Sequence, residues 1–171
     1  IARSTKRETI VTLQILFGLY SLHMKICVVG TGYVGLSLAV LLAQKYEVVT
    51  LDVSKERIDN INNKKSPFRD TELEDFLQNK PLNLKSTINK NEAYENAEYV
   101  VIATPTNYDD LTGSFDTSTV EEVISDCIKI NQQGLIIIKS TVPIGFTDNM
   151  RNRFNNEDII FSPEFLRENK A

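Results

Sequence analysis

Cysteine and histidine are scarce in this chain, and their scarcity excludes two kinds of chemistry. The 171 residues include two cysteines and one histidine. Cys27 and Cys127 each lie in an apolar pattern, without the spacing of metal ligands or the neighbours that activate a thiol. His23 has no evident partner. We therefore predict no metal site and no cysteine nucleophile, and we expect both thiols to be small buried side chains in a reducing compartment.

An excess of positive charge is also missing. The chain has 19 Lys and Arg against 23 Asp and Glu, a net charge of −4, and no basic stripe. This balance argues against a nucleic-acid partner. Internal repeats and low-complexity segments are absent from the sequence as well, and the length suits one domain with a full core.

No apolar run is long enough to span a bilayer. Residues 10–22 form an apolar run after several basic residues, as in a signal peptide, but no small-residue cleavage site precedes Met24. We expect residues 1–23 to be an extension outside the domain, with a targeting or membrane segment as the alternative. The domain predicted below for residues 24–171 is of a type found in the cytosol. We therefore predict a cytoplasmic protein with no membrane partner.

Three glycines after a short apolar strand are the most informative pattern that is present. Residues 25–29 are rich in β-branched side chains, Gly30, Gly32 and Gly35 follow, and a helical pattern begins at once. This is the dinucleotide fingerprint in its required context of strand, tight turn and helix. Gly30 would allow the turn, Gly32 would let a diphosphate approach the helix N-terminus, and Gly35 would let the helix pack on the strand.

A carboxylate follows the glycines at the expected distance. Asp52 ends the apolar segment 47–51, about 20 residues after the glycines, where an acidic residue can accept the hydroxyls of an adenosine ribose. A carboxylate there would repel a 2′-phosphate, so the pattern favours NAD over NADP. The alternative is that Asp52 caps a helix beginning at Val53 or Ser54. Arg57 lies close enough to weaken the preference or to lie along the adenosine.

Strand and helix patterns alternate along the rest of the chain with short connections. This alternation predicts an α/β fold, a Rossmann-like doubly wound parallel six-stranded sheet with strand order 3-2-1-4-5-6, over residues 24–171. The expected strands are 25–29, 47–51, 84–87, 99–103, 135–138 and 158–161, and the expected helices are 34–45, 55–62, 71–78, 89–96, 117–131 and 147–154.

Two of these helices carry local patterns. In the helix at 34–45, the inward stripe is expected to be Val34, Leu38, Leu41 and Leu42. The helix at 71–78 is expected to begin with Asp70 or Thr71 as its cap, with Glu74 placed to complete a capping box with Thr71.

Polar clusters follow three of the predicted strands, each with a proline that stiffens the turn. They are residues 104–107, 140–145 and 162–168. Ligands bind at the carboxyl ends of such strands, so we predict a site at this edge. The alternative is that the clusters only cap helices or close turns, as Ser140, Thr141 and Thr117 could do. Glu164 and Glu168 would share one helical face, which suits a general base or two solvated carboxylates.

The same motifs carry a family resemblance. The chain resembles the UDP-glucose 6-dehydrogenase family, within the wider UDP-glucose/GDP-mannose dehydrogenases, from Met24 to Ala171. The motifs are GTGYVGL at 30–36, VIATPT at 101–106, KSTVPIG at 139–145 and FSPEFLRE at 161–168. Asn169 departs from the glycine that many members have there.

The resemblance implies roles for residues of these motifs. NAD is the implied cofactor, and its contacts are Tyr33 and Val34 in the glycine loop, Asp52, Arg57, Thr106 and Thr141. The run Glu164, Phe165, Leu166, Arg167 and Glu168 is the implied first substrate-binding segment. Thr141 and Glu164 resemble residues that hold a catalytic water, and Glu168 resembles a carboxylate that assists hydrolysis of a thioester.

The implied reaction oxidises the sugar C6 alcohol of UDP-glucose to a carboxylate, with two NAD used in succession and the aldehyde held on a cysteine. That cysteine, the lysine and asparagine near the sugar, and a long dimerisation helix lie beyond this stretch in the family, and neither Cys27 nor Cys127 matches the cysteine motif. We therefore expect an inactive fragment of a homodimeric enzyme that supplies UDP-glucuronate for polysaccharide or capsule. The alternatives are a dehydrogenase of GDP-mannose or a UDP-N-acetyl amino sugar, and a free-standing NAD-binding module.

Overall fold

Six parallel strands form the centre of the protein. The computed structural model describes residues 24–110 and 113–163. The sheet has the order β3-β2-β1-β4-β7-β8, and every pairing is parallel. Counted along the sheet alone this is 3-2-1-4-5-6, so the predicted topology is confirmed. The strands are β1 (Lys25–Val29), β2 (Glu47–Leu51), β3 (Leu84–Thr87), β4 (Tyr99–Ile102), β7 (Leu135–Ile138) and β8 (Ile159–Phe161).

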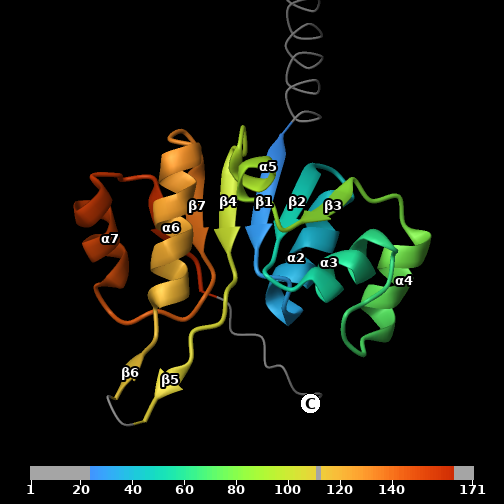
Figure 1. Cartoon of the computed structure of the whole chain (residues 1–171), viewed down its shortest axis with the longest axis horizontal. Coiled ribbons are helices and arrows are strands. Elements are labelled where there is room, and N and C mark those ends of the chain that lie inside the picture. The colour runs from blue at the N-terminus through green and yellow to red at the C-terminus, as the bar shows by residue number, and fades with distance from the viewer. Residues whose placement is uncertain (1–23, 111–112, 164–171) are drawn as a thin grey trace, which may run out of the picture.

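Helices cover both faces of this sheet (Figure 1). They are α2 (Tyr33–Ala43), α3 (Lys55–Asn62), α4 (Thr71–Asn79), α5 (Lys90–Tyr94), α6 (Ser118–Ile130) and α7 (Phe146–Phe154), with bounds within two residues of those expected. Side chains of β1 alternate between the faces: Ile26 and Val28 pack in one cluster with α2, whereas Cys27 and Val29 pack with α5, α6 and α7. Burial on both faces explains why residues 26–29 of this strand are all apolar.

The predicted inward stripe of α2 is wrong in part, because Leu38 and Leu42 do pack against the sheet but Leu41 does not. Leu41 is 59% exposed, and the buried residues of the helix are Gly35, Leu36, Ala39, Val40 and Ala43. Ala39 and Ala43 lie against the sheet, while Leu36 and Val40 pack with α3 and α4. Nearly every residue of this helix is apolar, so hydrophobic periodicity could not identify its buried face. Ala39 and Ala43 have small side chains, which let the helix approach the sheet closely.

A short antiparallel hairpin between β4 and α6 was not predicted. It consists of β5 (Tyr108–Asp109) and β6 (Ser114–Phe115), and it extends past the carboxyl edge of the sheet (Figure 1). The rings of Tyr108 and Phe115 meet edge to face, with centroids 5.1 Å apart. Strands of two residues are too short to produce a detectable alternation, so the sequence pattern gave no signal for them.

Two helix caps differ in part from expectation. Asp70 caps α4 by accepting hydrogen bonds from the Glu72 and Leu73 N–H groups, but Glu74 accepts from the Ser66 N–H at 2.6 Å instead of completing a box with Thr71. Thr117 occupies the N-cap position of α6 without a side-chain cap bond. Its hydroxyl donates to Glu121, which lies one turn into the helix.

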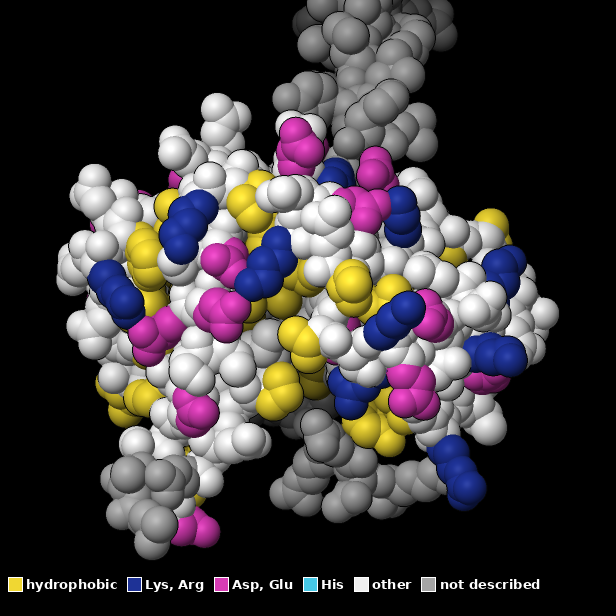
Figure 2. Space-filling view, in the orientation of Figure 1, with side chains coloured by type: hydrophobic (Ala, Val, Ile, Leu, Met, Phe, Trp, Pro, Cys, Tyr) yellow, Lys and Arg dark blue, Asp and Glu magenta, His cyan; other side chains and the backbone are white. Residues whose placement is uncertain are grey.

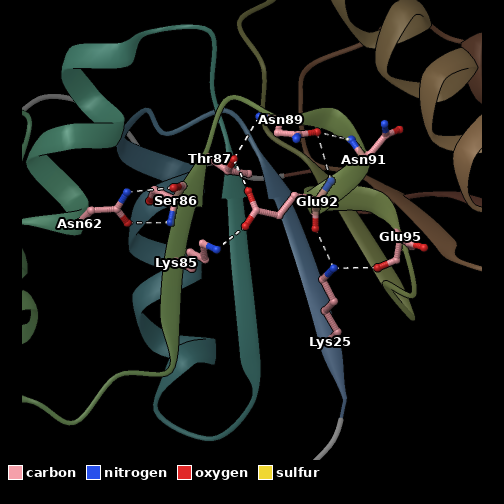
Figure 3. A network of polar contacts seen from close by, with 9 residues as sticks. All are labelled: Lys25, Asn62, Lys85, Ser86, Thr87, Asn89, Asn91, Glu92 and Glu95. Atoms are coloured by element: carbon pink, nitrogen blue, oxygen red, sulfur yellow. Dashed lines mark hydrogen bonds and ion pairs between the residues drawn. The ribbon is translucent and has the colours of Figure 1, made fainter.

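A polar network joins β1, the edge strand β3 and the helix α5 (Figure 3). The Lys25 ammonium donates to the Glu92 and Glu95 carbonyls at 2.8 and 2.7 Å, at the C-terminal end of α5. The Glu92 carboxylate pairs with Lys85 and accepts from Thr87. A cation at a helix C-terminus is favourable, so these bonds help to anchor a helix of only five residues.

The remaining surface observations are brief. The face seen in Figure 2 carries Lys and Arg interspersed with Asp and Glu, without a continuous basic stripe. Among the residues that the structure describes, no helix is long and apolar enough to cross a bilayer. Cys27 and Cys127 are both free and fully buried, as expected.

Candidate functional site

The glycine loop between β1 and α2 has the tight geometry that its sequence predicts. Gly30 has φ +93°, and a Cβ there would lie 2.5 Å from the Ala103 carbonyl oxygen, so this turn requires glycine. At Gly35 a Cβ would lie 1.9 Å from the Gly30 oxygen, which shows how closely α2 approaches the turn. Gly32 differs from both, because a Cβ there would meet no heavy atom within 4 Å.

The N-terminus of α2 is open to a ligand. Gly32 occupies the N-cap position, no side chain among residues 24–110 and 113–163 caps the helix, and its first turn contains no acidic residue. The first N–H groups of a helix have no intrahelical acceptor, and the helix dipole adds positive potential at that end. An anion that approached over Gly32 would therefore meet unpaired donors and no side chain of that residue.

Asp52 faces this loop from the end of β2. Its Oδ2 accepts two hydrogen bonds from Thr31, one from the backbone N–H at 2.7 Å and one from the hydroxyl at 2.6 Å. Its Oδ1 accepts from the Ser54 N–H at 2.9 Å. The Arg57 guanidinium lies 3.7 Å from Oδ2 and is 47% exposed, whereas the Asp52 side chain is 8% exposed.

These contacts keep the carboxyl of Asp52 ionised. Burial alone would raise its pKa, but the hydrogen bonds from Thr31 and Ser54, with the charge of Arg57, outweigh burial and hold the pKa below the usual value. The alternative expectation that Asp52 caps a helix is wrong, because the N-cap of α3 is Ser54. Asp52 Oδ1 instead orders the turn before α3 by accepting from the Ser54 N–H. The carboxylate remains negative at neutral pH and lies beside the loop that begins α2.

The ends of β4 and β7 lie side by side at the same edge. The Ser140 hydroxyl donates to the Thr104 carbonyl at 2.6 Å and is also 3.3 Å from that of Ile102, so it ties the two strand ends together. Ser140 therefore has a structural role, although it joins two strands and does not cap a helix or close its own turn as the alternative expected. Thr141 is exposed and Thr106 half-buried, and neither side chain has a hydrogen bond within the described residues. Both hydroxyls stay available.

The other predicted site residues fall into two groups. The Tyr33 ring packs on Phe68, with centroids 4.0 Å apart, and Tyr33 is 41% exposed. Val34 is half-buried. Glu164, Phe165, Leu166, Arg167 and Glu168 lie outside the described residues, so their predicted roles stay predictions. Within the described part of the chain, no group of three acidic, His or Cys side chains gathers in a way that could hold a metal ion.

Sequence reasoning missed Thr31. Its side chain is fully buried and contacts the carboxylate that the ribose prediction depends on. The only available signal was a hydroxyl residue between the first two glycines, and spacing alone could not show that it points toward the end of β2. This residue becomes visible as a partner only once β1 and β2 are paired in register.

Comparison with known proteins agrees with this geometry. A family model described as "UDP-glucose/GDP-mannose dehydrogenase family, NAD binding domain" matches residues 24–171. The chain belongs to this family. The fold of residues 24–163 is that of the nucleotide-binding domain of the UDP-glucose/GDP-mannose dehydrogenases, and the cofactor of that domain is NAD.

Several members of the UDP-glucose/GDP-mannose dehydrogenase family are similar to the chain. A UDP-glucose 6-dehydrogenase of Streptococcus pneumoniae is 53% identical over 148 residues, and one of Campylobacter jejuni is 49% identical over 150 residues. Each alignment covers 86% of this chain and 38% of the relative. The chain thus spans well under half the length of the curated relatives that it matches.

Solved structures of the family share the fold. A GDP-mannose dehydrogenase from Pseudomonas aeruginosa matches with a TM-score of 0.74 at 29% identity, over 85% of this chain and 37% of that one. A UDP-glucose dehydrogenase from Pyrobaculum islandicum matches with a TM-score of 0.73 at 27% identity, over 86% of this chain and 37% of that one.

Proposed function

We propose that NAD binds along the carboxyl edge of the sheet, with its diphosphate over Gly32 and its adenosine ribose at Asp52. The observation that carries this proposal is the pairing of an uncapped helix N-terminus with an ionised carboxylate beside it. The donor set fits the cofactor, because the free N–H groups suit a diphosphate and the carboxylate suits a hydroxyl.

Each further residue has a place in this proposal. Gly30 and Gly35 shape the loop, Tyr33 and Val34 contribute N–H groups of the first helical turn, and Arg57 lies along the adenosine. Thr106 and Thr141, at the ends of β4 and β7, would contact the nicotinamide half. Ser140 supports them by joining the two strand ends.

The whole protein is proposed to be a UDP-glucose 6-dehydrogenase that oxidises UDP-glucose to UDP-glucuronate. The two relatives at 53% and 49% identity, both named UDP-glucose 6-dehydrogenase, support this substrate. Bound NAD would accept hydride, and this chain's part would be to bind and orient it. Glu164 to Glu168 would contact the sugar nucleotide, with Thr141 and Glu164 holding a water and Glu168 assisting hydrolysis. We further propose a homodimeric, cytoplasmic enzyme that supplies polysaccharide synthesis.

The chain by itself is proposed to bind NAD without oxidising sugar. Neither thiol suits a covalent intermediate: burial raises the pKa of Cys127 to about 12, and burial together with the nearby Cys127 raises that of Cys27 further. A protonated, buried thiol is a poor nucleophile.

Fold likeness does not decide between nucleotide sugars. The solved GDP-mannose and UDP-glucose dehydrogenases match this chain with TM-scores of 0.74 and 0.73. A dehydrogenase acting on GDP-mannose is therefore the second candidate, and sequence identity favours UDP-glucose.

Calorimetric titration of the folded chain tests the cofactor proposal. We expect saturable binding of NAD and at least about tenfold weaker binding of NADP, because the 2′-phosphate would meet the Asp52 carboxylate. Asp52→Asn serves as the matched variant and should weaken NAD binding while narrowing the difference between the cofactors. Equal affinity for both cofactors in the unaltered chain would contradict the role of Asp52. Production of NADH from UDP-glucose by this chain alone would contradict its proposed inactivity.

A further inference from the structure

The Asp52 carboxylate has less free acceptor capacity than its position suggests. Each carboxylate oxygen offers about two lone-pair sites for hydrogen bonds. Oδ2 already accepts from the N–H and the hydroxyl of Thr31, at 2.7 and 2.6 Å. Oδ1 accepts from the Ser54 N–H at 2.9 Å, and the structure gives it no second donor among the described residues.

The Thr31 hydroxyl has no reason to leave this carboxylate. The Thr31 side chain is completely buried, and its bond to Asp52 is the only side-chain hydrogen bond that the described residues give it. Rotating the hydroxyl away would leave a buried donor without a partner, which costs more than an ordinary hydrogen bond contributes. Bonds to a charged acceptor are also among the stronger ones in proteins.

The low exposure of the Asp52 side chain agrees with the small number of acceptor sites that its carboxylate has free. The Asp52 side chain retains 8% of its exposure, so little of the carboxylate can meet a ligand. A ribose presents two neighbouring hydroxyls, and holding both on separate oxygens would need a free site on Oδ2 as well as on Oδ1.

We propose that Thr31 is a positioning residue that saturates Oδ2 and leaves Asp52 able to accept only one ribose hydroxyl, through Oδ1. Acidic residues at this place in dinucleotide-binding folds bond the 2′-hydroxyl, so that hydroxyl is the one recognised. This inference rests on the proposed NAD site. It makes the 3′-hydroxyl of the adenosine ribose unimportant to Asp52.

Deoxy analogues of the cofactor test the proposal. In the full 171-residue chain, NAD lacking the adenosine 2′-hydroxyl should bind about 10- to 100-fold more weakly than NAD, the loss typical of a charged hydrogen bond. The analogue lacking the 3′-hydroxyl should bind within about threefold of NAD, since no charged bond is lost. A comparable loss with both analogues would overturn the proposal.

Variants of Thr31 separate positioning from simple packing. Thr31→Ser keeps the hydroxyl and should keep the difference between the two analogues. Thr31→Val and Thr31→Ala free a site on Oδ2, so both analogues should then bind more weakly than NAD. Two variants of different size are used because a buried Val can pack poorly in a threonine site. Retention of the 2′-only pattern in either folded variant contradicts the proposal.

A measurement without ligand keeps this inference separate from the proposed function. The Asp52 carboxyl carbon can be titrated by NMR in the free chain. Removing the Thr31 hydroxyl should raise the pKa of Asp52, whereas Thr31→Ser should leave it low. An unchanged pKa in Thr31→Ala shows that the hydroxyl does not hold the carboxylate, even if NAD binds. Failure of NAD to bind, with the pKa shift present, refutes the proposed function and leaves the Thr31 contact established.

Discussion

Adding one methyl group at Gly35 or at Gly32 should have opposite consequences. At Gly35 the new Cβ would lie 1.9 Å from the Gly30 oxygen and 3.2 Å from the Ala103 Cβ. The first of these atoms belongs to the backbone and cannot rotate away. To restore an ordinary van der Waals separation of about 3.5 Å, α2 must move outward by more than about 1 Å. At Gly32 the same methyl would meet nothing within 4 Å.

The magnitudes follow from this difference. Overpacking a well-packed site costs about 1–3 kcal/mol, and the gain of about 0.5–1 kcal/mol from replacing glycine in a helix offsets part of it. We expect Gly35→Ala to lower the free energy of unfolding by about 1–2 kcal/mol, which corresponds to about 2–8 °C in Tm for a domain of this size. Gly32→Ala should change stability by no more than about 0.5 kcal/mol, as surface substitutions usually do.

Gly32→Ala should weaken NAD binding although it leaves stability nearly unchanged. If a diphosphate lies over that residue, its methyl occupies the approach and NAD affinity should fall at least about tenfold, since the charged bonds to the helix N–H groups lengthen. Thermal unfolding and calorimetric NAD titration of both variants check the two effects together. A stable Gly35→Ala variant, or a Gly32→Ala variant that binds NAD normally, would refute the geometry on which the site is built.

Three further predictions concern side chains around the site. The pKa of Asp52 is lowered in the folded chain, so the ionised carboxylate stabilises the fold. This contribution is complete above the usual carboxyl pKa of about 3.9 and is lost as the pH falls through the pKa of the folded state. Asp52→Asn should therefore reduce the loss of stability that acid causes in the unaltered chain. Ser140→Ala should cost about 1–3 kcal/mol in urea unfolding because the Thr104 carbonyl loses its donor, and an unchanged midpoint would contradict the tie between β4 and β7. Cys27 and Cys127 should resist a thiol reagent in the folded chain and react in denaturant, and rapid labelling of the native chain would show that they are not buried.

Sequence patterns predicted the parts of this fold that depend on local chemistry and regular spacing. The β1 strand, the turn at Gly30 and the strand order follow from apolar runs, glycine conformation and right-handed crossovers. The position of Asp52 followed from its distance along the chain. These features needed no knowledge of how side chains meet across the sheet.

The features that were missed depend on tertiary contacts. The buried face of α2 is set by which small residues meet the sheet, and its uniformly apolar sequence hides that choice. The role of Thr31 depends on the pairing of β1 with β2, which brings residues 21 positions apart into contact. Glu74 bonds the Ser66 N–H because the connection before α4 folds back over it.

The central claim is that NAD binds at the helix N-terminus after Thr31 with its ribose at Asp52. Calorimetric titration of the folded chain with NAD, repeated with Asp52→Asn, tests it most directly. The account predicts a single saturable site in the unaltered chain and an affinity lower by about 10- to 100-fold in the variant. A folded chain with no affinity for NAD, or a variant that binds it equally well, would contradict the account.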